Sequence, residues 1–228
     1  MNNTPQTAFH SVDEEWFASY CAGGLSPAKH LLISCQSTMK PELSSRLAAM
    51  DQVGGALLES AQGEALSKDF FERILEKMEA VPVSQGLNSA GELQPENTSR
   101  DAWVPSPLED FLKRTGQELR WKKLGFGVER ASLSNDDGEE LYLLKAPPGL
   151  KVPRHTHEGE EWALILQGGY KVGTESYGPG DLHREDESCT HQPIVDDDGE
   201  PCITLVALEG SLKFSNPIMR LLKPVIGI

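Results

Sequence analysis

The segment GLKVPRHTHEGEEWALILQG constrains the fold of this 228-residue chain more than any other. Successive side chains of a β-strand point to opposite faces, so residues of equal parity share a face. His155, His157 and Glu161 share parity with alternate residues of the apolar run that follows. If the loop between them preserves the alternation, two imidazoles and a carboxylate face the interior of a β-structure. A carboxylate buried there without a cation would be costly, so the pattern favours a divalent first-row metal.

An ordinary alternative exists for an isolated HxH pair, because two solvated histidines on a surface strand are common. The spacing here is more specific. Gly149 lies six residues before His155, Glu161 follows His157 by four, and Gly168 follows Glu161 by seven. This spacing resembles the first motif of the cupin family, G(x)5HxH(x)3E(x)6G, and the resemblance implies a metal-binding β-barrel.

A fourth ligand is expected from a later strand that runs beside the first. His183, in GPGDLHRED, falls three residues beyond Gly180, at the spacing of the ordinary second cupin motif. His191, in ESCTHQP, lies farther along the chain. Spacing within the sequence does not decide between His183 and His191 as the fourth ligand.

Residues 11–80 follow a helical period that predicts four helices. The first is expected after an N-cap at Ser11 or Asp13 and ends at the glycines of CAGG. The second and third open at the prolines of SPAKH and KPELS, because a missing amide donor costs nothing in a first turn. The fourth lies in SKDFFERILEKMEA, with Ser67 as its cap.

The next stretch, VPVSQGLNSAGELQPENTSR, mixes Pro, Gly, Ser and charge with no sustained period, which is typical of a flexible connector. Short alternating strands with glycine-rich and acidic turns follow it, the first two around a DDG turn. We therefore predict an α+β chain with a helical domain at 1–82, a linker at 83–100 and a β-domain at 101–228.

The charge of the chain limits its partners. A formal net charge of -14 and a pI near 4.8 repel phosphate backbones and anionic membranes, so direct nucleic-acid binding is not expected. No apolar run approaches the roughly 20 residues that span a bilayer, and the N-terminus lacks the features of a secretion signal. The four cysteines form no CxxC pair. These features predict a cytoplasmic protein with free thiols.

Taken together, the helical segment AMDQVGGALLES, the connector, and the later RHTHEGEEWALILQG, YGPGDL and CTHQP resemble the ChrR-type anti-sigma factors over nearly the whole chain. The resemblance implies a small helical bundle that sequesters an extracytoplasmic-function sigma factor. It also implies a C-terminal cupin β-barrel, or double-stranded β-helix, that senses oxidative stress. The implied metal is zinc, held by His155, His157, Glu161 and His191. On this ground His191 is favoured over His183.

The helical part departs from the related zinc-binding anti-sigma domains. Those domains hold a structural zinc through an early histidine and a later HxxxCxxC. His10 stands at the early position, but an alignment on MDQVGG places Gln36, Lys40 and Leu43 at the other three. Three of the four ligands are therefore missing.

A substitute set can be drawn from His10, Cys21, His30 and Cys35. However, His30 and Cys35 lie five residues apart, about 140° around a helix, so one helix would not direct both toward one ion. We expect a helical domain without a metal, held together by its apolar stripe.

Two functions follow from these patterns. The first is a transcriptional regulator whose helices bind a sigma factor and whose metal cupin modulates release. The alternative is a cupin dioxygenase that uses iron or manganese to cleave a small diketone-like compound, which zinc cannot do because it has no second oxidation state. The regulator is preferred, since no catalytic set is evident beyond the metal ligands. The apolar C-terminal tail in LKFSNPIMRLLKPVIGI suggests a barrel cover or a homodimer contact.

Overall fold

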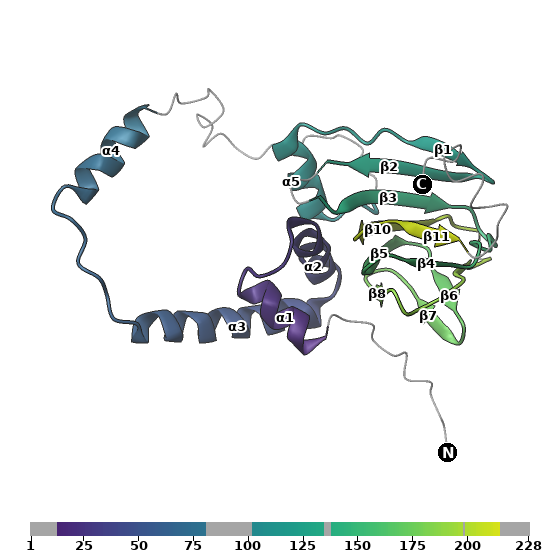
Figure 1. Cartoon of the computed structure of the whole chain (residues 1–228), viewed down its shortest axis with the longest axis horizontal. Helices are drawn as coiled ribbons and strands as arrows, with labels where there is room; N and C mark the ends of the chain where they lie inside the picture. The colour runs from purple at the N-terminus through teal and green to yellow at the C-terminus, as the bar shows by residue number, and fades with distance from the viewer. Residues whose placement is uncertain (1–12, 81–101, 135–137, 198, 215–228) are drawn as a thin grey trace, which may run out of the picture. The chain divides into compact units, whose positions relative to one another are not determined.

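The computed structural model describes residues 13–80, 102–134, 138–197 and 199–214, and these form an α+β structure of five helices followed by eleven strands (Figure 1). The helices are α1 (Glu14–Cys21), α2 (Pro27–Met39), α3 (Pro41–Ser60), α4 (Phe70–Ala80) and α5 (Ser106–Thr115). The strands are β1 (Lys122–Gly125), β2 (Val128–Leu133), β3 (Glu140–Ala146), β4 (His155–His157), β5 (Glu161–Gln167), β6 (Tyr170–Val172), β7 (Glu175–Tyr177), β8 (Leu182–Glu185), β9 (Ile194–Val195), β10 (Cys202–Leu208) and β11 (Leu212–Phe214). None of these helices is both long enough and apolar enough to cross a bilayer.

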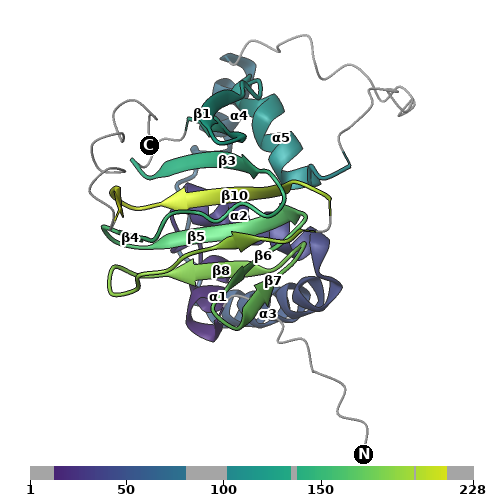
Figure 2. The same ribbon diagram turned by 90° about the vertical axis from the view of Figure 1, so that its right-hand side faces the viewer.

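The strands form antiparallel sheets. The largest has six strands in the order β1-β2-β3-β10-β5-β8, and smaller sheets pair β7-β6-β9 and β11-β4. Figure 2 shows β3, β10, β5 and β8 side by side, with α2 behind the sheet. The predicted fold class, helices followed by an antiparallel β-domain, is confirmed.

The two faces of the large sheet serve different cores. On one face Trp162, Leu164 and Leu205 belong to a cluster that also contains buried residues of α2 and α5. On the other face Ala163 and Val206 belong to a separate cluster. Adjacent residues of β5 and β10 thus point to opposite sides, as strand alternation requires. The predicted common face of Glu161 and Ala163 is therefore the face turned away from the helices.

Helix α2 is built into this structure by its sequence. Ser26 caps its N-terminus by accepting a hydrogen bond from the Lys29 amide, and Pro27 occupies the first turn. The helix contacts β5, β10 and α5, and its Leu32 and Ile33 are fully buried. Burial of two such side chains contributes about 3–6 kcal/mol of hydrophobic stabilisation.

Polar contacts fix both ends of α2 against the β-domain. The Lys29 ammonium lies 3.5 Å from a Glu139 carboxylate oxygen and 3.0 Å from one of Glu160, and it also contacts Glu209. At the other end, Gln36 donates to the Gly180 carbonyl at 3.0 Å. Lys40 lies just beyond the helix and pairs with Asp181 at 3.1 Å.

The chain divides into two compact units, Met1–Asp51 with Ala102–Ile228, and Gln52–Asp101. The first contains α1, α2, the start of α3, α5 and all the strands. The second contains the end of α3 and all of α4. The boundaries predicted at 82/83 and 100/101 lie outside the described residues, so they stay predictions.

Two details differ from the sequence-based expectation. Helix α4 begins at Phe70, three residues after the predicted cap Ser67, whose carbonyl accepts the Phe70 amide in a turn. Helix α5 was not predicted at all; it is a short helix with a C-cap at Gly116 in the left-handed conformation and one fully buried residue, Leu108. The C-terminal tail beyond Phe214 lies outside the described residues.

Candidate metal centre

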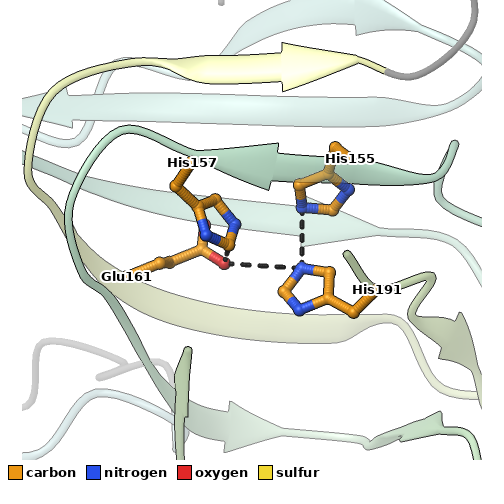
Figure 3. A group of neighbouring side chains, drawn as sticks. All are labelled: His155, His157, Glu161 and His191. Atoms are coloured by element: carbon orange, nitrogen blue, oxygen red, sulfur yellow. Dashed lines mark hydrogen bonds and ion pairs between the residues drawn. The ribbon is translucent and has the colours of Figure 1, made fainter. Parts of the chain in front are cut away.

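The four predicted ligands lie together on the inner side of the β-domain (Figure 3). His155 and His157 come from the ends of β4, and Glu161 is the first residue of β5. His191 reaches them because its backbone pairs with that of His155 through two hydrogen bonds of 3.1 Å. This backbone pairing between two residues 36 positions apart therefore brings His191 next to the HxH motif.

The ligand atoms converge. The Nε2 atoms of His155 and His191 lie 2.9 Å apart, and Nε2 of His157 lies 3.1 Å from Oε2 of Glu161. Nε2 of His191 is 3.9 Å from the same oxygen, and one ligand atom from each residue lies within 4.8 Å of all the others. Ligand atoms about 2.0–2.1 Å from a tetrahedral zinc would be separated by roughly 3.3 Å. The observed distances lie around this value.

Unsatisfied nitrogens indicate that the group suits a cation. Both ring nitrogens of His157 and Nδ1 of His191 are buried and make no hydrogen bond among the described residues. The close approach of His157 to Glu161 is thus an ion-pair distance without hydrogen-bond geometry. Buried polar atoms normally find a partner, so the unpaired Nε2 of His157 beside the Glu161 carboxylate favours a bound metal.

The protonation state of His155 also fits a ligand. Its Nδ1 lies 2.8 Å from the Pro153 carbonyl, to which it donates, and this leaves Nε2 free of its proton. Burial lowers the pKa of His155 to about 4, so the ring is neutral at physiological pH. For Glu161, burial alone would raise the pKa, but the neighbouring His157, with His155 and His191, brings the pKa below its ordinary value. A neutral imidazole and an ionised carboxylate are the forms that bind metals.

His183 occupies a neighbouring position. It lies on β8 opposite Ala163, and both of its ring nitrogens have partners: Nδ1 lies 2.8 Å from the Tyr170 hydroxyl and Nε2 lies 2.9 Å from Glu185. The His183 side chain is buried beside the four-residue group, but both of its ring nitrogens already contact other side chains. The four-residue group therefore contains His191 and not His183, and the assignment of His191 as the fourth ligand stays a prediction.

Glu185 was not predicted from the sequence. Its Oε1 lies 3.4 Å from Nδ1 of His191 and 2.9 Å from Nε2 of His183, and contacts to these two histidines hold the pKa of Glu185 well below its usual range. A carboxylate behind a ligating histidine orients the ring and increases its basicity. No sequence spacing pointed to this residue, because the contact depends on β8 lying beside the loop that carries His191.

The alternative set in the helices is not brought together. Within the residues that the structure describes, both groups of potential metal ligands lie in the β-domain. Cys35 is fully buried, and burial raises the pKa of its thiol to about 12; His30 stacks on Tyr20 instead, at 4.3 Å between ring centroids. His10 lies outside the described residues, so the prediction of a metal-free helical region stays a prediction.

Comparisons with known proteins agree with this layout. Residues 109–209 match the family model described as the ChrR cupin-like domain. The chain is 31% identical over 224 residues to the anti-sigma-E factor ChrR of Cereibacter sphaeroides, and the match covers 97% of this chain and 100% of that protein. The crystal structure of Rhodobacter sphaeroides SigE in complex with the anti-sigma ChrR matches with a TM-score of 0.70 and 30% identity, over 88% of this chain and 98% of the other.

Cupin enzymes are far more distant. A putative acetylacetone dioxygenase from Methylibium petroleiphilum PM1 has 17% identity and a TM-score of 0.38, over 44% of this chain and 77% of that one. Such a likeness carries no argument about activity. The match over nearly the whole chain is instead to an anti-sigma factor. This chain belongs to the ChrR family of anti-sigma factors and has the family's cupin-like domain.

Proposed function

We propose that the protein is an anti-sigma factor that sequesters an extracytoplasmic-function sigma factor, and that its β-domain holds a divalent metal and adjusts the release of that partner under oxidative stress. Membership of the ChrR family over nearly the whole chain supports the class of partner. Sigma factors act on RNA polymerase in the cytoplasm, so the proposal places the protein there.

The apolar face of α4 is the observation that carries the proposal. Phe71 and Met78 are 69% and 66% exposed, and Phe70, Ile74 and Leu75 on the same side are also exposed. These positions recur at helical spacing, so they form one stripe. The end of α3 exposes Val53, Leu57 and Leu58 as well. An exposed apolar stripe such as the one on α4 indicates a protein–protein interface.

The charge of the helical region suits such a partner. Residues 1–80 contain 11 Asp or Glu against 6 Lys or Arg. Sigma factors bind promoter DNA through basic surfaces, and an acidic binder complements a basic partner in the encounter. The apolar stripe would supply affinity and the acidic flanks orientation.

We infer that the metal is zinc, with iron or manganese as the alternative, and that it is held by His155, His157, Glu161 and His191. Three imidazoles and one carboxylate are a familiar set for zinc. Zinc would supply a non-redox crosslink between the strands. Two residues of the chain would orient the ligands: the Pro153 carbonyl contacts the ring of His155, and the Glu185 carboxylate contacts the ring of His191.

A route from this group to the helices runs through neighbouring residues. Glu160 precedes the ligand Glu161 and contacts Lys29 of α2. Asp181 lies two residues before His183 and pairs with Lys40, which separates α2 from α3. A rearrangement of the metal group would therefore strain the contacts at both ends of α2. This is how the β-domain could act on α2 and on the start of α3.

The test is co-purification of the full chain with the extracytoplasmic-function sigma factors of its own organism, each co-expressed in turn. Replacing Phe71 and Ile74 together by glutamate (F71E/I74E) puts two charges on the apolar stripe, and we expect the retained sigma factor to be lost. Arg73→Glu introduces the same side chain on the polar side of α4 and should leave binding intact. Retention of the sigma factor by F71E/I74E would contradict the assignment of this surface.

A further inference from the structure

A cavity of about 340 Å³ lies on the face of the large sheet that is turned away from the helices. Its walls are mainly apolar and include Leu144, Val206 and Leu212. His155 and Glu161 of the metal group also border it. This volume falls within the range of about 300–1,000 Å³ for small-molecule sites, and a few polar groups in an apolar wall are characteristic of them.

Two basic side chains line this wall, the exposed Lys151 and the largely buried Arg130. The guanidinium carbon of Arg130 lies 4.0 Å from the ring centre of Tyr142, and its Nη2 pairs with Glu140 at 2.7 Å, so the side chain is held in place. The side chain is only 11% exposed, and its Nε is buried without a hydrogen-bond partner among the described residues. A buried, unsatisfied donor on a fixed cation is the feature expected of a site for an anionic oxygen.

Phe126 lines the same cavity and has an unfavourable position in the fold. It lies in the two-residue turn between β1 and β2, at φ 51°, and its side chain is 80% exposed. Turns with two residues at positive φ favour Asn-Gly or Asp-Gly. An aromatic residue in such a turn destabilises the folded state in two ways, because its backbone is strained and its apolar ring is exposed to water. Neither the turn nor the core explains a phenylalanine at this position. A molecule bound in the cavity would give this ring an apolar contact.

We propose that this cavity binds a small, mainly apolar monocarboxylate, whose carboxylate accepts a hydrogen bond from Arg130 and whose hydrocarbon part lies against Leu144, Val206 and Phe126. Binding is non-covalent and needs no co-reactant. A role of this ligand as the signal that adjusts sigma-factor release rests on the proposed function. Binding itself does not depend on it.

Isothermal titration calorimetry on the zinc-loaded full chain tests the site, with octanoate as the probe and 1-octanol as its uncharged counterpart. We expect saturable binding of octanoate with a negative heat-capacity change, as for burial of apolar surface. Arg130→Met should weaken octanoate by at least about tenfold, the loss expected for one charge-assisted hydrogen bond. The same variant should leave 1-octanol binding unchanged, which a merely structural effect would not do.

Leu144→Trp narrows the cavity without touching the metal group, and it should weaken both octanoate and 1-octanol. The matched variant Lys145→Trp adds the same ring on the opposite face of β3 and should bind octanoate like the wild type. The proposal is overturned if the wild type does not bind octanoate, or if R130M and L144W bind it as tightly as the wild type does. Sigma-factor co-purification is measured separately, so octanoate binding without a retained sigma factor would reject the proposed function and leave the site standing.

Discussion

Helices α2 and α4 differ in their exposure to water, although both carry apolar residues at helical spacing. In α2, Leu32, Ile33 and Cys35 are fully buried against the β-domain. In α4, by contrast, Phe71 is 69% exposed, and each of the other large apolar residues of that helix is at least 38% exposed. The comparison shows that apolar periodicity identifies a face that needs a partner. Whether the chain itself supplies that partner depends on the tertiary structure.

The largest expected effect on stability comes from replacing one leucine by alanine in each of the two helices. Leu32→Ala leaves a cavity in a closed core and should lower the free energy of unfolding by about 3–5 kcal/mol. Leu75→Ala removes a side chain that is 43% exposed and should change it by less than about 0.5 kcal/mol. Urea denaturation followed by circular dichroism measures both variants. Equal losses would show that α4 is as well packed in the free protein as α2.

Lys29 offers the second test, since it fixes α2 to three carboxylates. Lys29→Met leaves those carboxylates without their cation, and we expect a loss of about 3 kcal/mol, as when one partner of a buried ion pair is removed. Lys68→Met removes an exposed lysine next to α4 and should stay within about 0.5 kcal/mol of the wild type. If Lys29→Met lowered the free energy of unfolding as little as Lys68→Met, the contacts of Lys29 with the three carboxylates would not hold α2 in place.

Metal removal should distinguish the two units. A metal present at 100 times its Kd adds about 2.7 kcal/mol to the folded state, so chelation should lower the melting temperature and increase amide exchange in β4 and β5. Amide exchange in α4 should not change. His191→Ala should abolish metal binding and mimic chelation, whereas His183→Ala should retain stoichiometric metal by elemental analysis. The opposite result would make His183 the fourth ligand.

The pH dependence of the α2 contact is the smallest effect. Burial by itself lowers the pKa of Lys29, but its contacts with Glu209 and Glu160 raise it above 10.5, so its contribution is present below that pH and is lost only above it. The contact with Lys29 lowers the pKa of Glu209 below 4.5, so that contribution is present above pH 4.5 and is lost in acid.

The stability difference between the wild type and Lys29→Met should therefore stay constant from about pH 6 to about pH 9 and shrink below about pH 4.5. Denaturation of both proteins over this range measures it. A difference that changed near neutral pH would mean that another group controls the contact.

Local rules explain what could be predicted from the sequence. Strand alternation predicted the common face of His155, His157 and Glu161, because side-chain direction follows from neighbouring backbone geometry. Proline and capping signals predicted the starts of α2 and α3, since they act within one turn. Helix α4 was expected from its apolar period, but its first residue was misplaced because Ser67 closes a turn before the helix instead of capping it.

Contacts between distant segments could not be predicted in this way. Three contacts join residues from separate parts of the chain. Backbone pairing brings His191 to His155, and the Glu185 carboxylate lies against the His191 ring. The Lys29 ammonium contacts the carboxylates of Glu139, Glu160 and Glu209. The sequence by itself determined which side chains could form a metal group and which faces were apolar, because spacing sets direction within one element. Only the tertiary structure decided which elements meet, because that depends on how strands and helices from distant segments pack together.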